Sequence, residues 1–158
     1  MKNESPMTQE GYNKIQAELD QLIKVDREAI KRSIAEAREL GDLKENAEYH
    51  AAKEKQSLIE GRIAQLQAVL ASSKIVDVRK IQSEKIVFGA TVTLLDLESD
   101  ESIKYQVVGE EESDTKRGRI SYTSPMGKAL IGREVGDTVV VKAPKGDREY
   151  EIKAIEFI

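Results

Sequence analysis

The chain has 158 residues, enough for one or two small domains with a hydrophobic core but not for a large one. Its 25 Lys and Arg against 29 Asp and Glu give a net charge of -4, which argues against nucleic-acid binding through a broad basic surface. The absence of cysteine excludes disulfides and thiolate metal sites. The first seven residues lack the apolar core of a signal peptide and no apolar run has bilayer length, so we expect a cytoplasmic protein without membrane contact.

Residues 8–73 are free of proline and rich in Ala, Glu, Lys, Gln and Leu, a composition that favours helix. Apolar residues recur at steps of three and four, with a phase slip near Val25 and a polar break at residues 41–46. The predicted seam comprises Tyr12, Ile15, Leu19, Leu22, Ile30, Ile34, Ala37 and Leu40 before the break, and Ala47, Ala51, Leu58, Ile59, Ile63, Leu66 and Leu70 after it. Because each apolar stripe is narrow, the two helices are predicted to cover each other as an antiparallel coiled-coil hairpin.

From about residue 75 the pattern changes to short, β-branched and partly alternating segments. Strands are predicted at residues 75–78, 86–88, 90–95, 103–108, 138–142 and 150–158. A turn at residues 144–147 should join the last two strands as a hairpin. One short helix is predicted at residues 124–131, with Ser124 as N-cap and Pro125 at the first helical position. The predicted fold class is α+β, with a helical hairpin over residues 1–75 and a small antiparallel sheet domain with one helix over residues 76–158.

The polar break carries two acids, Asp42 and Glu45, whose spacing has two interpretations. Asp-x-x-Glu is the spacing of a capping box at the start of the second helix, and on spacing alone this interpretation is favoured. Alternatively, two carboxylates one turn apart can fill part of the coordination shell of Mg²⁺ if another molecule supplies the rest. His50, the only histidine, lacks a Glu-x-x-His partner because Ala47 lies three residues before it, so packing or exposure is favoured over metal binding.

Several stretches carry a family resemblance. GDLKENAEYHAA (residues 41–52) and EGRI (residues 60–63) resemble the tip signature of the bacterial Gre family of transcript-cleavage and elongation factors. FGATV (residues 88–92), SPMGKALIG (residues 124–132) and VGD (residues 135–137) resemble the C-terminal domain of the same family. The likeness covers essentially the whole chain, and the modest number of basic residues resembles the less basic branch of the family. It implies a hairpin that enters the secondary channel of RNA polymerase and an FKBP-like domain that docks at the channel's rim.

The resemblance also implies a function for the two acids. Asp42 and Glu45 correspond to the family's catalytic pair, which would retain a weakly held Mg²⁺ in the polymerase active centre and orient the attacking water. The protein would thereby stimulate cleavage of the 3′ segment of backtracked RNA and rescue arrested complexes. It would act as a monomeric accessory factor and not as an enzyme, and Mg²⁺ is not expected on the isolated protein.

Other residues match the family with weaker implications. Arg38 and Lys53 are candidates for contact with RNA phosphates, although solvated surface charge is an equally good explanation. Ser124 and Pro125 match the loop that touches the polymerase rim, although a helix start also accounts for both. Asn46 and Tyr49 match the family tip and are expected to shape it.

Three alternatives remain open at this point. FKBP-like folds include prolyl isomerases, but a chain with no Trp and two Phe cannot easily line their aromatic pocket. A channel-binding polymerase inhibitor and a non-catalytic coiled-coil adaptor are the other two. The presence of both Asp42 and Glu45 argues against an inhibitor, because inhibition does not need two acids.

Overall fold

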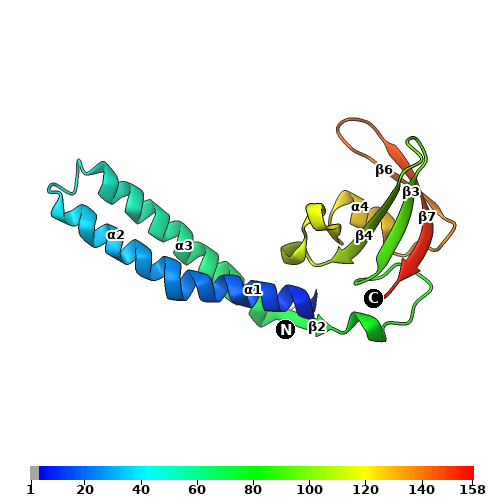
Figure 1. Cartoon of the computed structure of the whole chain (residues 1–158), viewed down its shortest axis with the longest axis horizontal. Helices are drawn as coiled ribbons and strands as arrows, with labels where there is room; N and C mark the ends of the chain where they lie inside the picture. The colour runs from blue at the N-terminus through cyan, green and yellow to red at the C-terminus, as the bar shows by residue number, and fades with distance from the viewer. Residues whose placement is uncertain (1–3) are drawn as a thin grey trace. The chain divides into compact units, whose positions relative to one another are not determined.

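The computed structural model describes residues 4–158 (Figure 1). The first three residues, part of the segment noted above as lacking the apolar core of a signal peptide, lie outside the described residues. The chain divides into two compact units. One is Asn13–Ser72, and the other combines the residues up to Tyr12 with Ser73–Ile158. Within residues 4–158, no helix has the length and apolar character needed to cross a membrane.

Two antiparallel helical arms joined by one loop form the hairpin, as Figure 1 shows. The first arm runs through α1 (Gln9–Gln21), η1 (Leu22–Asp26) and α2 (Arg27–Glu39), and the second arm is α3 (Ala47–Ser72). With 26 residues, α3 is ~39 Å long at the usual helical rise. The predicted hairpin is confirmed. The π-helical segment η1 adds an extra residue to one turn, which accounts for the predicted phase slip near Val25.

Buried apolar side chains line the seam between the arms. They are Ile15, Leu19, Ile30, Ile34 and Ala37 from the first arm and Ala52, Ile59, Ile63 and Leu66 from the second. Four predicted seam residues are exposed instead: Leu40, Ala47, Ala51 and Leu58. Leu58 is exposed because the neighbouring Ile59 takes the inward position, and Leu40 follows the last residue of α2. Ion pairs Arg27–Glu60 (2.8 Å) and Arg62–Glu18 (3.1 Å) link the arms and hold their register.

The second unit contains a five-stranded sheet in the order β5-β4-β3-β7-β6. Its strands are β3 (Thr91–Asp96), β4 (Ser102–Val108), β5 (Arg119–Ser121), β6 (Thr138–Val141) and β7 (Arg148–Glu156). The sheet is mixed and not wholly antiparallel as predicted, because β5 pairs with β4 in parallel. Two 3₁₀-helices, η3 (Glu110–Glu112) and η4 (Thr115–Arg117), connect β4 to β5. They bring the chain back along β4, so that Arg119 at the start of β5 pairs with Gln106.

One strand at the start of the chain was not predicted. It is β1 (Ser5–Thr8), which pairs in parallel with β2 (Ser73–Val76), directly after α3. A short 3₁₀-helix, η2 (Val78–Lys80), follows β2. A four-residue strand that begins with a Ser-Pro dipeptide carries little β signal, and only its distant partner stabilises it.

The core of the second unit lies between the sheet and α4 (Pro125–Leu130). Val92, Leu94, Leu130 and Ile152 are fully buried there. The predicted strand at residues 86–88 is wrong, because this segment forms no ladder with a strand of the sheet. Its backbone is held by an isolated bridge at Lys85 and by hydrogen bonds between Ile86 and the chain at residues 132–133. It still contributes the fully buried Ile86 to the core, which explains its apolar composition.

Candidate functional site

The loop between α2 and α3, residues 41–46 and hereafter the tip loop, carries both predicted catalytic acids. Gly41 has φ +125°, in the region that favours glycine, and turns the chain away from the end of α2. Asp42 and Glu45 are exposed. Asp42 Oδ1 accepts a hydrogen bond from the Lys44 backbone N–H (3.0 Å), which forms a local turn. Glu45 accepts no hydrogen bond within residues 4–158, so its carboxylate is available to a ligand from outside the chain.

The N-cap of α3 is Asn46, and the predicted capping box of Asp42 and Glu45 is wrong. Asn46 Oδ1 accepts a hydrogen bond from the Tyr49 backbone N–H (3.0 Å), the third residue of the helix. An N-cap at Asp42 would start the helix at residue 43, but α3 starts four residues later, at Ala47. Asn46 therefore takes the capping role that was predicted for Asp42. Asn46 Nδ2 also donates to the Ala37 carbonyl (2.6 Å), which ties the last turn of α2 to the first turn of α3. The expected role of Asn46 in shaping the tip is therefore confirmed.

Further polar side chains flank the tip loop. His50 Nε2 lies 2.9 Å from the Lys44 carbonyl oxygen. The Arg38 guanidinium lies 5.8 Å from the centre of the Tyr49 ring, within the range of a cation–π contact. Lys53 Nζ donates to Gln56 Oε1 (3.4 Å) on the surface of α3. Both basic residues predicted to approach RNA are exposed and lie near the tip loop, one on each arm.

The two acids of the tip loop do not form a complete metal site. Across residues 4–158, no group of three or more His, Cys, Asp or Glu side chains is placed to hold a metal ion. Carboxylate oxygens are nevertheless the ligands that Mg²⁺ prefers. Asp42 and Glu45 thus fit a site that they share with another molecule and do not fit a site that this chain supplies alone.

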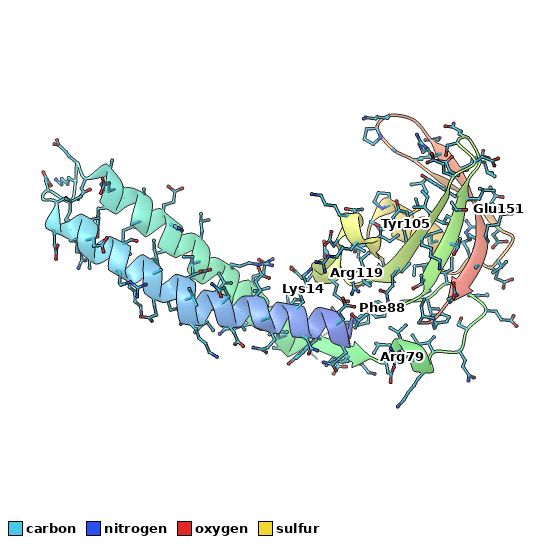
Figure 2. All side chains as sticks on the ribbon, in the orientation of Figure 1. Lys14, Arg79, Phe88, Tyr105, Arg119 and Glu151 are labelled. Carbon is cyan, nitrogen blue, oxygen red and sulfur yellow. The ribbon has the colours of Figure 1, made fainter. Side chains whose placement is uncertain are left out.

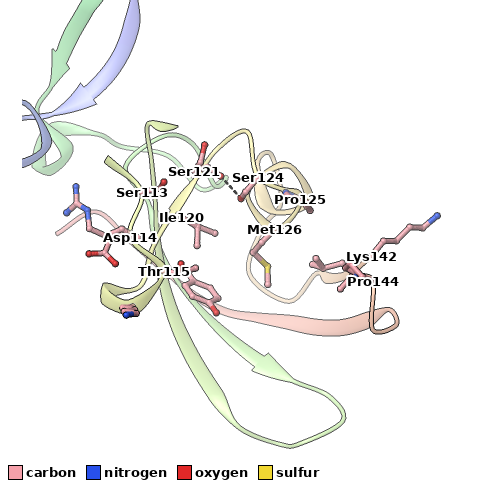
Figure 3. Close-up of a pocket in the computed structure, with 15 residues that line it drawn as sticks. Ser113, Asp114, Thr115, Ile120, Ser121, Ser124, Pro125, Met126, Lys142 and Pro144 are labelled. Atoms are coloured by element: carbon pink, nitrogen blue, oxygen red, sulfur yellow. Dashed lines mark hydrogen bonds between the residues drawn. The ribbon is translucent and has the colours of Figure 1, made fainter. Parts of the chain in front are cut away.

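Ser124 and Pro125 lie at the start of α4, where they line a cavity of about 800 Å³ (Figure 3). Ser124 Oγ accepts from the Gly127 N–H (3.0 Å) and donates to the Ser121 carbonyl (2.6 Å), so the predicted N-cap is confirmed. A Cβ at Gly127 would lie 2.0 Å from the Ser121 oxygen, so only glycine permits this close approach. Tyr105 is the single aromatic residue among the described lining residues, which argues against a prolyl-isomerase pocket.

A buried acidic site was missed by the sequence interpretation. The Glu112 side chain is fully buried, and we call it and its partners the Glu112 network: Thr8, Gly109, Glu112 and Arg119. Glu112 Oε1 accepts from the Thr8 N–H (3.1 Å), the Thr8 hydroxyl and Arg119 Nη2 (3.2 Å), and Oε2 accepts from the Gly109 N–H (3.0 Å). Arg119 is labelled in Figure 2. Glu112 is the last of three consecutive glutamates, a pattern that resembles a solvated surface and gives no sign of burial.

Comparison with known proteins covers both units. A family model described as "Transcription elongation factor, N-terminal" matches residues 5–75. A second, described as "Transcription elongation factor, GreA/GreB, C-term", matches residues 81–157. These two models together span nearly the whole chain.

Individual relatives match over their full lengths. The transcription elongation factor GreA of Thermodesulfovibrio yellowstonii is 55% identical over 157 residues, with 99% of each chain covered. GreA of Xylella fastidiosa strain 9a5c is 54% identical, with 98% of each chain covered. Among solved structures, the GreA factor homolog 1 (Gfh1) of Thermus thermophilus is 32% identical, with 98% of this chain and 99% of that chain covered and a TM-score of 0.46. The two family models and the two GreA relatives show that the chain belongs to the GreA/GreB family of transcription elongation factors.

Proposed function

We propose that this protein binds RNA polymerase, inserts the tip loop into the secondary channel and stimulates the polymerase's own Mg²⁺-dependent cleavage of the 3′ segment of backtracked RNA. The observation that carries the proposal is the pair of exposed acids, Asp42 and Glu45, on the loop that joins two long helices. Family membership supports it. The protein is an accessory factor, because the hydrolytic active site belongs to the polymerase, and it acts as a monomer in the cytoplasm.

The acids contribute the part of the chemistry that this chain holds. Asp42 and Glu45 would supply oxygen ligands to a magnesium ion of the polymerase active centre and accept a hydrogen bond from the attacking water. Such an ion, when bound, would lower the pKa of a bound water and stabilise negative charge on the phosphate. Neither carboxylate is buried or paired with a cation. Glu45 accepts no hydrogen bond within residues 4–158, and Asp42 accepts one, from the Lys44 N–H to Oδ1, so its other oxygen remains available to a ligand.

Two further pairs of residues have proposed roles in the complex. Arg38 and Lys53, on opposite arms beside the tip loop, contact phosphates of the RNA 3′ segment. Ser124 and Pro125, at the start of α4, contact the rim of the channel. Both belong to a rigid helix start, since the Ser124 hydroxyl is fixed at Ser121 and Gly127, and a rigid surface loses little entropy on binding.

A polymerase inhibitor that fills the channel without cleavage, or an adaptor with no catalytic role, is the second candidate. The same hairpin would serve both. One assay separates these functions: a stalled, backtracked elongation complex is incubated with Mg²⁺ and the protein, and the transcript is examined for shortening from its 3′ end. Release of a 3′ fragment supports the cleavage factor, and an intact transcript supports the alternatives.

Asp42→Asn is the sharpest variant for this assay. Asparagine keeps the Oδ1 acceptor for the Lys44 N–H, so the loop turn survives, but it is a poor ligand for Mg²⁺. Outer-shell changes at metal sites cost ~10–100-fold, so loss of a direct ligand is expected to lower cleavage roughly 100-fold or more. Polymerase affinity, measured by competition or gel shift, should be unchanged. Cleavage at the wild-type rate by Asp42→Asn would show that the acids have no part in the reaction.

A further inference from the structure

Two side chains at the start of α3 hold the tip loop: that of Asn46, the N-cap, and that of His50 in the first turn. Asn46 connects the two helices through its bonds to Ala37 and Tyr49. His50, one turn further on, reaches back to the Lys44 carbonyl with Nε2 at 2.9 Å. A carbonyl oxygen only accepts hydrogen bonds, so Nε2 carries the proton and donates.

These hydrogen bonds fix the backbone next to the two acids. The Lys44 backbone is engaged on both sides: its N–H donates to Asp42 Oδ1, and its carbonyl accepts from His50. Glu45 lies between Lys44 and Asn46, so the residues before and after it are each fixed by a hydrogen bond from α3. The loop has few other constraints, because residues 41–45 are all exposed. The His50–Lys44 bond is thus one of the few interactions that restrict where Glu45 and Asp42 stand.

We propose that His50 is a positioning residue for transcript cleavage: it fixes the Lys44 backbone and thereby the placement of Asp42 and Glu45. This inference rests on the proposed function of the two acids. A loop that is ordered before it binds presents its carboxylates in one arrangement. Metal binding then does not have to overcome the loss of conformational entropy of the loop. His50 therefore acts through the loop and contacts neither the metal ion nor the RNA.

Two substitutions isolate the hydrogen bond from the rest of the side chain. His50→Phe keeps a planar ring of similar size and removes the donor. His50→Gln removes the ring and carries an amide N–H donor at about the reach of Nε2. For His50→Phe we expect the maximal cleavage rate to fall roughly 10-fold and the Mg²⁺ concentration at half-maximal rate to rise, as for other outer-shell changes. For His50→Gln we expect a maximal cleavage rate and a half-maximal Mg²⁺ concentration close to those of the wild type.

The controls separate this proposal from a stability effect and from failure of the proposed function. His50 is exposed, so the melting temperature and the affinity for polymerase should be the same in both variants as in the wild type. If Asp42→Asn is inactive while His50→Phe cleaves like the wild type, the positioning role is wrong and the function of the acids stands. If His50→Phe and His50→Gln lose activity equally, the imidazole itself matters and the proposal is overturned. If Asp42→Asn cleaves normally, the proposed function fails and the His50 proposal fails with it.

Discussion

The tip loop and the Glu112 network show two opposite treatments of a carboxylate in one chain. Asp42 and Glu45 are exposed, and of the two only Asp42 accepts a hydrogen bond, from the Lys44 backbone N–H. Glu112 is fully buried, and both of its oxygens are occupied by donors from Thr8, Gly109 and Arg119. A buried charge is tolerated only when it is paired and hydrogen-bonded, and that requirement uses up its capacity to bind anything else. An acid that must bind a ligand from another molecule has to remain exposed.

The comparison predicts first that removal of Glu112 is costly for stability. Glu112→Ala leaves Arg119, which is only 13% exposed, without its buried partner and leaves two backbone N–H groups without an acceptor. Breaking a buried pair on one side costs ~3–5 kcal/mol, so the free energy of unfolding in urea should fall by about that amount. Glu45→Ala is the matched control at the exposed site and should leave the unfolding free energy unchanged. A small loss for Glu112→Ala would show that the network contributes little.

Gly11 offers a finer test of the same network. A Cβ at this position would lie 2.0 Å from Glu112 Oε1, and the carboxylate cannot move aside without losing its bonds to Thr8 and Arg119. Overpacking of this kind costs ~1–3 kcal/mol, more than the helix propensity that alanine adds. Gly61→Ala is the control, because nothing lies within 4 Å of its Cβ, and it should stabilise α3 by up to ~1 kcal/mol. Thermal unfolding of both variants checks whether their shifts have opposite signs.

Asp96 is a third acid, buried like Glu112, and its ionisation should affect stability in acid. The hydrogen bond from the Glu98 N–H (2.9 Å), followed by the bond from Arg148 (2.6 Å), holds the pKa of Asp96 below its ordinary value. Because the folded pKa is lower than the unfolded one, the contribution to stability is complete above the unfolded value of about 3.9 and is lost as the pH falls through the folded pKa.

The measurement for Asp96 is the unfolding free energy as a function of pH. Asp96→Asn should be less stable than the wild type at pH 7, and the difference should shrink as the pH falls below about 4. A difference that stays constant down to the acid limit would mean that the charge of Asp96 does not stabilise the folded state.

The smallest expected effect concerns the basic residues at the tip loop. Neutralising Arg38 and Lys53 together, as Arg38→Gln and Lys53→Gln, should weaken crosslinking of the RNA 3′ segment to the protein by a few-fold. Exposed charges near phosphates add only modest, salt-dependent attraction, so the loss should diminish at higher ionic strength. Arg32→Gln with Lys55→Gln is a control of equal charge on exposed helix surface. If the control reduces the crosslink equally, general charge and not position accounts for the effect.

The sequence predicted the parts of the structure that depend on local periodicity. The steps of three and four gave both arms, the polar break gave the tip loop, and Ser124-Pro125 gave the start of α4. The choice among neighbouring capping residues could not be made, because Asp42 and Asn46 are both good N-caps and only the true helix start decides between them. One signal pointed to Asn46: the helix-favouring run Ala-Glu-Tyr-His-Ala-Ala begins directly after it.

The features that were missed depend on partners far apart along the chain. Thr8 and Glu112 are separated by 104 positions, and nothing near either residue announces the other. The same reason explains why β1 and the parallel pairing of β5 were not predicted, since each is a short strand defined by its partner. Leu58 and Ile59 are both apolar, and only the packing of the arms decides that Ile59 is the buried one.

The pairing of β1 with β2 has a practical consequence for dissecting the protein. In chain order, everything from α1 to α3 is an insertion between two strands that belong together. A fragment that starts at residue 76 would lack β1 with Thr8 and all but the last residue of β2, and would expose the Glu112 carboxylate to solvent. A short Gly-Ser bridge that replaces residues 13–72 would excise the arms and retain both strands, which makes it the better route to an independently folding globular half.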